Sequence, residues 1–218
     1  MTVQMLFLCN PNNPTGNTIP EQILTEILQF CASKKVRVVA DECFLRFHPH
    51  YEKMSCKRFL KQYPNLLTVN AFTKFYAMAG LRLGYLMTGD LSLLHAVAQQ
   101  LPEWNVSSIA QRAGISALQD TEYEKRTRQL IEKERRYLIQ EFLKMGCTVF
   151  PSEADYITFR LPQEKTGFLL KERLLEGKIL IRSCANYRNM PPDCYRIAVK
   201  QHADNEELVR QVWRILIQ

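Results

Sequence analysis

The chain has 218 residues, of which 46% are hydrophobic and 23% charged, with 8 Gly and 10 Pro. This composition is ordinary for a globular protein and argues against disorder, collagen and low-complexity sequence. No stretch reaches the roughly twenty apolar residues that span a bilayer, and residues 1–10 lack the basic segment and cleavage site of a signal peptide. We therefore expect a cytoplasmic protein with no membrane partner.

The formal net charge is +7, but the basic residues do not form one run. Many of them lie between acidic residues over positions 122–144, where mixed charge indicates the solvated face of a helix. Nucleic-acid binding is one interpretation of this charge, and an enzyme that collects anionic ligands with individually placed arginines and lysines is another. The motifs below decide for the enzyme, and with it we expect no nucleic-acid partner.

The seven cysteines contain no CxxC pair, and the four histidines are not grouped with them. An odd number of dispersed cysteines is typical of reduced thiols rather than of a disulfide framework. Without a cluster of ligand-type side chains we expect no metal site.

In the first part of the chain, short apolar runs alternate with helical patterns. Pro20 opens a predicted helix whose apolar positions recur with i, i+4, i+8 spacing. The predicted strands are residues 5–9, 36–40, 66–70 and 83–87, and a further predicted helix covers about 91–101. Strands separated by helices predict an α/β fold with a mostly parallel sheet that binds ligands at the carboxyl ends of its strands.

A long charged helix, predicted over about 121–145, leads to a different pattern. The expected elements beyond it are strands at 148–150, 156–161, 179–182 and 195–199, with helices at 168–175 and 205–217. This order predicts a small α+β unit. We place the boundary between the two parts near Asp120.

Two polar clusters directly follow predicted strands. The first is Asn10–Gly16, whose Asn, Pro and Gly residues are typical of a tight turn. The second is Asp41-Glu42, at the end of the strand 36–40. A carboxylate at a buried strand end needs a cation or hydrogen-bond donors, unless it only caps the next loop.

Two further clusters carry cations. Thr73-Lys74 follows the strand 66–70, and a lysine held in a loop among apolar residues is suited to act as an amine nucleophile, although most lysines are solvated surface groups. Arg182 and Arg196 each lie in a predicted strand. Arginine in an otherwise apolar strand indicates a bidentate anion clamp.

Together these clusters resemble the aspartate-aminotransferase-like (fold type I, class I and II) pyridoxal-phosphate enzymes. The matching segments, in family order, are NPNNPTG (10–16), DECF (41–44), FTKFYAMAGLRLGY (72–85), SEADY (152–156) and the strand of Arg196. The resemblance implies pyridoxal 5'-phosphate as the cofactor. It also implies that residues 1–120 form the C-terminal part of the cofactor-binding large domain, and residues 121–218 the small C-terminal domain.

The resemblance assigns roles to five residues toward the cofactor. Lys74 is the catalytic amine that bonds the cofactor aldehyde, and Asp41 keeps the pyridine nitrogen protonated so that the ring acts as an electron sink. Asn13 donates a hydrogen bond to the ring's 3-oxygen, and Thr73 and Arg82 bind the phosphate.

The resemblance also implies a substrate. Arg196 matches the family's clamp for the substrate carboxylate. Arg182, fourteen residues before it, is the candidate for a second anion site and suits a phosphorylated amino acid. The stretch ILIRSCANYR (179–188) is similar to the threonine-phosphate decarboxylases of cobalamin biosynthesis. Histidinol-phosphate aminotransferases are the alternative, because no motif decides between decarboxylation and transamination.

The sequence departs from the family pattern at three positions. Phe44 stands where many relatives have a Tyr that bonds the 3-oxygen, and Ala71 stands where a phosphate-binding Ser or Thr is common. Asp155 replaces the usual Asn of the S-x-A-N motif and adds a negative charge near the substrate region. The first two changes are expected to weaken cofactor contacts without removing them.

The chain begins where the sequences of the family are already well advanced. We therefore expect it to be the C-terminal portion of such an enzyme, with a missing N-terminal segment of the same fold as its partner. Relatives carry in that segment a helix N-terminus for the cofactor phosphate and an aromatic ring that stacks on the cofactor. We expect a homodimer, and weak cofactor binding by this chain alone; an inactive or interaction fragment is the rival hypothesis.

Overall fold

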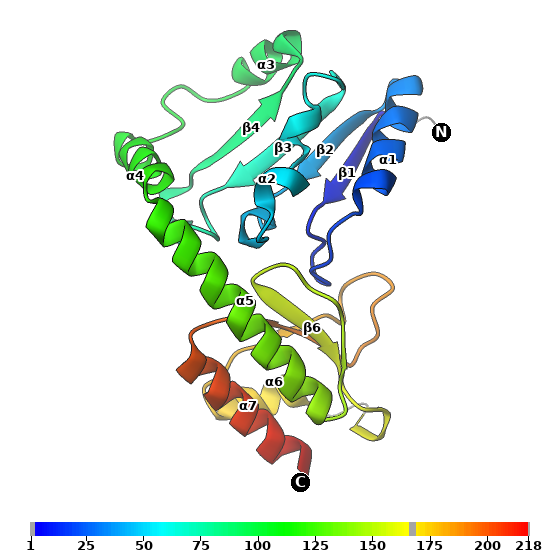
Figure 1. The fold of residues 1–218 in the computed structure, drawn as a ribbon, viewed down its shortest axis with the longest axis vertical. Helices are drawn as coiled ribbons and strands as arrows, with labels where there is room; N and C mark the ends of the chain where they lie inside the picture. The colour runs from blue at the N-terminus through cyan, green and yellow to red at the C-terminus, as the bar shows by residue number, and fades with distance from the viewer. Residues whose placement is uncertain (1–2, 166–168, 218) are drawn as a thin grey trace. The chain divides into compact units, whose positions relative to one another are not determined.

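The computed structural model of the chain describes residues 3–165 and 169–217 (Figure 1). It divides into two compact units, one of Met1–Pro11 with Thr18–Lys125 and the other of Asn12–Asn17 with Arg126–Gln218. The short segment 12–17 thus belongs to the unit formed by the far end of the chain. These are the first and the second unit.

The first unit contains a four-stranded sheet in the order β1-β2-β3-β4. Its strands are β1 (Met5–Cys9), β2 (Arg37–Asp41), β3 (Leu66–Ala71) and β4 (Gly84–Thr88). The pairs β1·β2 and β2·β3 are parallel, and β3·β4 is antiparallel. The predicted α/β class, the mostly parallel sheet and the positions of these four strands are confirmed.

Short and long helices connect these strands. The α-helices of the unit are α1 (Glu21–Ser33), α2 (Tyr51–Met54), α3 (Leu91–Ala98), α4 (Ser108–Gln119) and the first residues of α5 (Thr121–Lys144). Three 3-10 turns join them, η1 (Leu45–Phe47), η2 (Cys56–Phe59) and η3 (Ala79–Leu81). Among the described residues no helix is both long and apolar enough to cross a membrane.

Helix α1 covers one face of this sheet through its i, i+4 stripe. Leu24 and Leu28 are buried and pack in one cluster with Val38, Ala40 and Leu66 of the strands. Burial of branched apolar side chains at helical and strand spacing is the main stabilising term here. The sequence pattern of this helix therefore identified its buried face.

Helix α4 was not predicted. Its buried positions are Ala110 and Gly114, and its large apolar residues, such as Ile109, are exposed. A Cβ at Gly114 would lie 2.6 Å from Leu83 Cδ2, so a larger residue here would require the Leu83 side chain to shift. Because its buried residues are small, this helix has no apolar stripe in the sequence. Its one recognisable signal is the N-cap Ser107, whose Oγ accepts a hydrogen bond from Ala110 N at 3.2 Å.

The second unit contains an antiparallel sheet in the order β5-β6-β8-β7. Its elements are β5 (Thr148–Val149), β6 (Tyr156–Arg160), η4 (Gln163–Lys165), α6 (Leu170–Glu176), β7 (Arg182–Ser183), β8 (Cys194–Ala198) and α7 (His202–Ile217), with most of α5. Phe142 of α5 and Phe159 of β6 are fully buried with ring centroids 4.3 Å apart. The predicted α+β pattern is confirmed.

Two elements of this unit begin three residues away from their predicted starts, the strand expected at 179 and the helix expected at 205. The strand expected at 179–182 is only Arg182–Ser183, because Ile179 N donates to Leu174 O at 2.9 Å and Lys178 has a φ of 62°. This is the turn that ends a helix, so these residues close α6 and do not pair in the sheet. The helix expected at 168–175 is α6, and Phe168 lies outside the described residues. Helix α7 begins at His202, earlier than the predicted residue 205.

Replacing Leu28 by Ala tests the core of the first unit. The side chain is fully buried, so Leu28→Ala is expected to lower the free energy of unfolding by about 2–5 kcal/mol. The control is Phe30→Ala on the same helix, where the ring is 63% exposed and the expected loss is below about 0.5 kcal/mol. Equal losses in chemical denaturation would contradict the packing described here.

Candidate functional site

Four residues singled out by the sequence lie at one edge of the first sheet. Because β1, β2 and β3 are parallel, their carboxyl ends meet there, and Asp41 pairs with Cys9 and with Val69. Thr73 and Lys74 follow the end of β3. Arg82 precedes β4, whose first residue pairs with the last residue of β3. The sheet topology therefore brings Asp41, Thr73, Lys74 and Arg82 to the same edge.

The Asp41 carboxylate is half-buried and is held by Cys43. Its Oδ1 accepts a hydrogen bond from Cys43 N at 3.0 Å. Burial, and next the hydrogen bond and charge of Asp41, raise the pKa of the Cys43 thiol to about 12, so the thiol stays protonated and donates. Within the described residues Asp41 has no ion pair, which leaves this carboxylate available to a cationic donor.

Lys74 presents an exposed amine beside an aromatic ring. Its Nζ lies 5.8 Å from the centroid of the Phe44 ring, and its charge lowers the pKa of the Cys43 thiol slightly. No carboxylate pairs with it in the part of the chain that the structure describes. The amine is therefore accessible and is close to Asp41 through their common neighbour Cys43.

The loop between Lys74 and β4 has two non-glycine residues in the left-handed region. Ala77 has a φ of 54° and Arg82 a φ of 51°. Such conformations cost free energy and often occur at functional sites. Arg82 is exposed, and its Nη1 donates to Ala79 O at 3.3 Å, which leaves most of its donors for a ligand.

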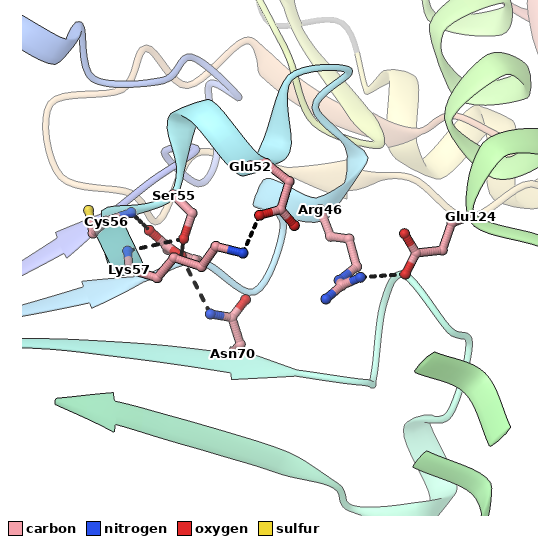
Figure 2. Close-up of polar contacts among 8 residues, drawn as sticks. Arg46, Glu52, Ser55, Cys56, Lys57, Asn70 and Glu124 are labelled. Carbon is pink, nitrogen blue, oxygen red and sulfur yellow. Dashed lines mark hydrogen bonds and ion pairs between the residues drawn. The ribbon is translucent and has the colours of Figure 1, made fainter. Parts of the chain in front are cut away.

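A buried carboxylate, Glu42, lies next to Asp41 in the chain. It is fully buried and accepts hydrogen bonds from Cys56 N at 2.6 Å, Ser55 Oγ at 2.7 Å and Asn70 Nδ2 at 3.5 Å. Figure 2 labels the three donor residues, Ser55, Cys56 and Asn70, which lie close together. Burial raises the pKa of Glu42, and the hydrogen bonds oppose that shift. The network joins the end of β2 to β3, just before Lys74.

A second network in the same unit fixes the first turn of α5. Arg46 forms an ion pair with Glu124 (Figure 2), and Tyr76 donates a hydrogen bond to the same carboxylate. The Arg46 guanidinium also lies 4.8 Å from the Tyr51 ring centroid. This network joins η1 and the loop after Lys74 to the start of α5, without containing a predicted site residue.

In the second unit, the segment 12–17 is fastened to strand β6 and the turn before it. Tyr156 Oη donates to Asn12 O at 2.8 Å, and Glu153 N donates to Gly16 O at 2.8 Å. Gly16 has a φ of +90°, and a Cβ there would lie 2.1 Å from Ser152 Oγ. Only glycine fits this turn, which explains the Gly of the NPNNPTG segment.

These contacts bring Asn13 to Arg196. Asn13 Oδ1 accepts hydrogen bonds from Arg196 Nη1 and from Tyr187 Oη, the latter at 3.2 Å. A guanidinium has donors only, so the atom that faces it is the amide oxygen. The Asn13 amide nitrogen, which has no partner among the described residues, therefore remains a hydrogen-bond donor for a ligand.

Arg182 and Arg196 lie directly opposite each other on β7 and β8. Two like charges in a cross-strand pair destabilise a sheet. Arg182 Nη2 donates to Asn186 Oδ1 at 2.9 Å, and Arg196 stacks on Tyr156 at 5.0 Å. Neither guanidinium has a carboxylate partner in the described ranges. An anion bound between them would relieve their repulsion, so the pair is a candidate anion site.

Reasoning from the sequence missed Cys43, the partners of Glu42, and Tyr187. None of them follows a periodic pattern, because each acts through one contact that folding creates. The sequence also indicated that the charge of Asp155 lies near the substrate region. In the second unit, burial lowers the pKa of the Arg135 guanidinium, and the Asp155 carboxylate is one of the charges that oppose this shift.

The comparisons with known proteins all indicate the same family. The family model described as aminotransferase class I and II matches residues 1–212. The threonine-phosphate decarboxylase of Salmonella typhimurium is 36% identical over 97% of this chain and 57% of its own length. The histidinol-phosphate aminotransferase of Clostridium kluyveri is 32% identical over 98% of this chain and 58% of its own length.

A solved structure of a histidinol-phosphate aminotransferase is also similar to this chain. The histidinol-phosphate aminotransferase of Clostridium acetobutylicum matches with a TM-score of 0.93 and 30% identity, over 99% of this chain and 64% of that one. The chain thus spans little more than half the length of the curated relatives that it matches.

The buried carboxylate predicts a pH dependence of stability. The folded state raises the pKa of Glu42 above its ordinary value of 4.5, so it holds this proton more tightly than the unfolded chain does. As the pH rises above 4.5, the free energy of unfolding should therefore fall relative to that of Glu42→Gln, by at most about 1.4 kcal/mol per pH unit.

Denaturation at a series of pH values measures this difference. Glu52→Gln is the matched control, because the Glu52 side chain is 70% exposed and its stability difference should change little over the same range. A Glu42→Gln curve parallel to that of the unchanged chain would contradict the raised pKa.

Proposed function

Because the chain belongs to the aminotransferase class I and II family, whose cofactor is pyridoxal 5'-phosphate, we propose that its first unit binds this cofactor. The donor set of the sheet edge fits the group. The half-buried carboxylate of Asp41, which has no cation partner among the described residues, suits a pyridinium nitrogen. The accessible amine of Lys74 suits an aldehyde, and the exposed guanidinium of Arg82 suits a phosphate.

Four residues of the first unit would hold the cofactor. Lys74 would bond the aldehyde through its amine, and Asp41, oriented by Cys43, would accept a hydrogen bond from the protonated ring nitrogen. Thr73 and Arg82 bind the phosphate as hydroxyl donor and cation. When bound, the cofactor supplies an electron sink for the breaking of a bond at the substrate Cα.

In the second unit, Asn13 is the proposed donor to the ring's 3-oxygen. Its carbonyl oxygen is already used by Arg196 and Tyr187, which turns the amide N–H groups outward as donors. This supports the role that the resemblance implied. Phe44 cannot supply the second donor that a tyrosine supplies in many relatives.

The substrate that we propose is a phosphorylated amino acid. Arg196 binds the carboxylate and Arg182 the phosphate. The single observation that carries this proposal is the cross-strand pair of two guanidinium groups without a carboxylate partner in the described residues. Bidentate binding of carboxylate and phosphate is the chemistry for which arginine is suited.

The reaction we favour is the decarboxylation of L-threonine O-3-phosphate, as in cobalamin biosynthesis. The 36% identity to the Salmonella typhimurium threonine-phosphate decarboxylase supports it. Transamination of a histidinol-phosphate-type substrate is the second candidate, supported by the TM-score of 0.93 to the Clostridium acetobutylicum enzyme. Both substrates combine an amino group with a phosphate.

The active protein that we propose is a cytoplasmic homodimer. In it, the portion of the relatives that this chain does not span supplies the remaining cofactor contacts. If those contacts are required, the chain by itself binds the cofactor weakly, and a role as an inactive or interacting fragment becomes the alternative.

A product assay tests the reaction. Pyridoxal 5'-phosphate and O-phospho-L-threonine are added to the chain by itself, and in a second experiment to a protein of its relatives' full length that contains this chain. Decarboxylation is expected to release carbon dioxide and leave the cofactor in its aldehyde form. Accumulation of the amine form together with a keto acid would instead favour the aminotransferase, and turnover of neither kind would contradict both.

Replacing Arg182 by Ala tests the phosphate site. The change removes charge-assisted hydrogen bonds to the phosphate and should weaken O-phospho-L-threonine binding about 10- to 100-fold, with little effect on L-threonine. Arg188→Ala, an exposed arginine of the same region, is the control and should change neither affinity. An equal loss for both ligands in calorimetric titrations would argue against a phosphate role.

A further inference from the structure

Tyr187 contacts both halves of the proposed anion site. Its hydroxyl donates to Asn13 Oδ1 at 3.2 Å, the same oxygen that accepts from Arg196. Its ring lies 5.8 Å from the Arg182 guanidinium. One half-buried side chain therefore connects the two arginines, although they lie on different strands.

The loop between β7 and β8 gives Tyr187 a fixed position. Cys184 N donates to Cys194 O at 2.8 Å and closes the loop at its base. Tyr187 N donates to Cys184 O at 3.0 Å, and Met190 N donates to Tyr187 O at 3.2 Å. Because the backbone holds the residue on both sides, a change in its side chain tests the contacts of the ring and hydroxyl rather than the path of the loop.

The charges explain why such a connection is needed. Two opposed guanidinium groups repel each other, and without another contact Arg182 would turn away from Arg196. The Tyr187 ring attracts Arg182 through its π face, and Asn186 binds one of its nitrogens at 2.9 Å. Arg182 keeps its other donors for an anion at a defined distance from Arg196.

We propose that Tyr187 is a specificity-determining positioning residue, whose ring holds Arg182 and whose hydroxyl holds Asn13, the acceptor of the Arg196 hydrogen bond, so that the site selects amino acids carrying a second anion. This inference rests on the proposed function. It assigns separate tasks to the ring and the hydroxyl of one side chain. Tyr187→Phe removes the hydroxyl alone and Tyr187→Leu removes both, so the difference between the two variants reports on the ring.

The test compares two variants, with O-phospho-L-threonine and L-threonine as probes for the 218-residue chain. Tyr187→Leu removes the ring and should reduce the preference for the phosphorylated ligand about two- to fivefold. Tyr187→Phe keeps the ring and should retain that preference, while both affinities fall together about two- to tenfold because Asn13 loses a donor. Tyr137→Phe, a half-buried tyrosine elsewhere in the unit, should change neither value.

Calorimetric titration gives both affinities, and circular dichroism shows that each variant is folded. Equal affinity of the unchanged chain for the two ligands would overturn the phosphate site of the proposed function, and this inference with it. An unchanged preference in a folded Tyr187→Leu variant would overturn the inference alone. If that variant does not fold, Tyr187→Phe decides, since affinities equal to those of the unchanged chain would overturn the role of the hydroxyl.

Discussion

The parallel pairing of β1, β2 and β3 is the constraint on which the first unit's proposed site depends. It brings the ends of three strands to one edge, so that residues distant in sequence, Asp41 and Lys74, share the neighbour Cys43. Glu42 strengthens this arrangement, because its buried carboxylate binds donors on η2 and on β3. Strand register and one buried acid thus position the proposed cofactor residues.

In the second unit, the antiparallel register of the strands creates the proposed anion site. Pairing of β7 with β8 sets Arg182 opposite Arg196, a repulsive arrangement that an anion would stabilise. The segment 12–17 reaches this unit because Gly16 permits close contact with Ser152. Asn13 thereby joins Arg196, so the proposed ring-oxygen donor and the proposed carboxylate clamp share a hydrogen bond.

The sequence predicted most of the strands and long helices, since their apolar residues follow regular periods, as in α1 with Leu24 and Leu28. It did not predict α4, whose buried residues Ala110 and Gly114 are small. The candidate site residues were identified from sequence motifs, and the structure shows which side chains contact them. Contacts such as Cys43 with Asp41, or Tyr187 with Asn13, could not be predicted, because they join side chains through geometry that no local pattern encodes.

The proposed function depends on the binding of pyridoxal 5'-phosphate at the carboxyl edge of the first sheet through Lys74. Borohydride reduction after the 218-residue chain is mixed with the cofactor, followed by peptide mapping of the labelled lysine, measures this directly. We expect label on Lys74, and its loss in Lys74→Arg. Label on an exposed lysine such as Lys53, undiminished in Lys74→Arg, would rule out Lys74 as the cofactor lysine.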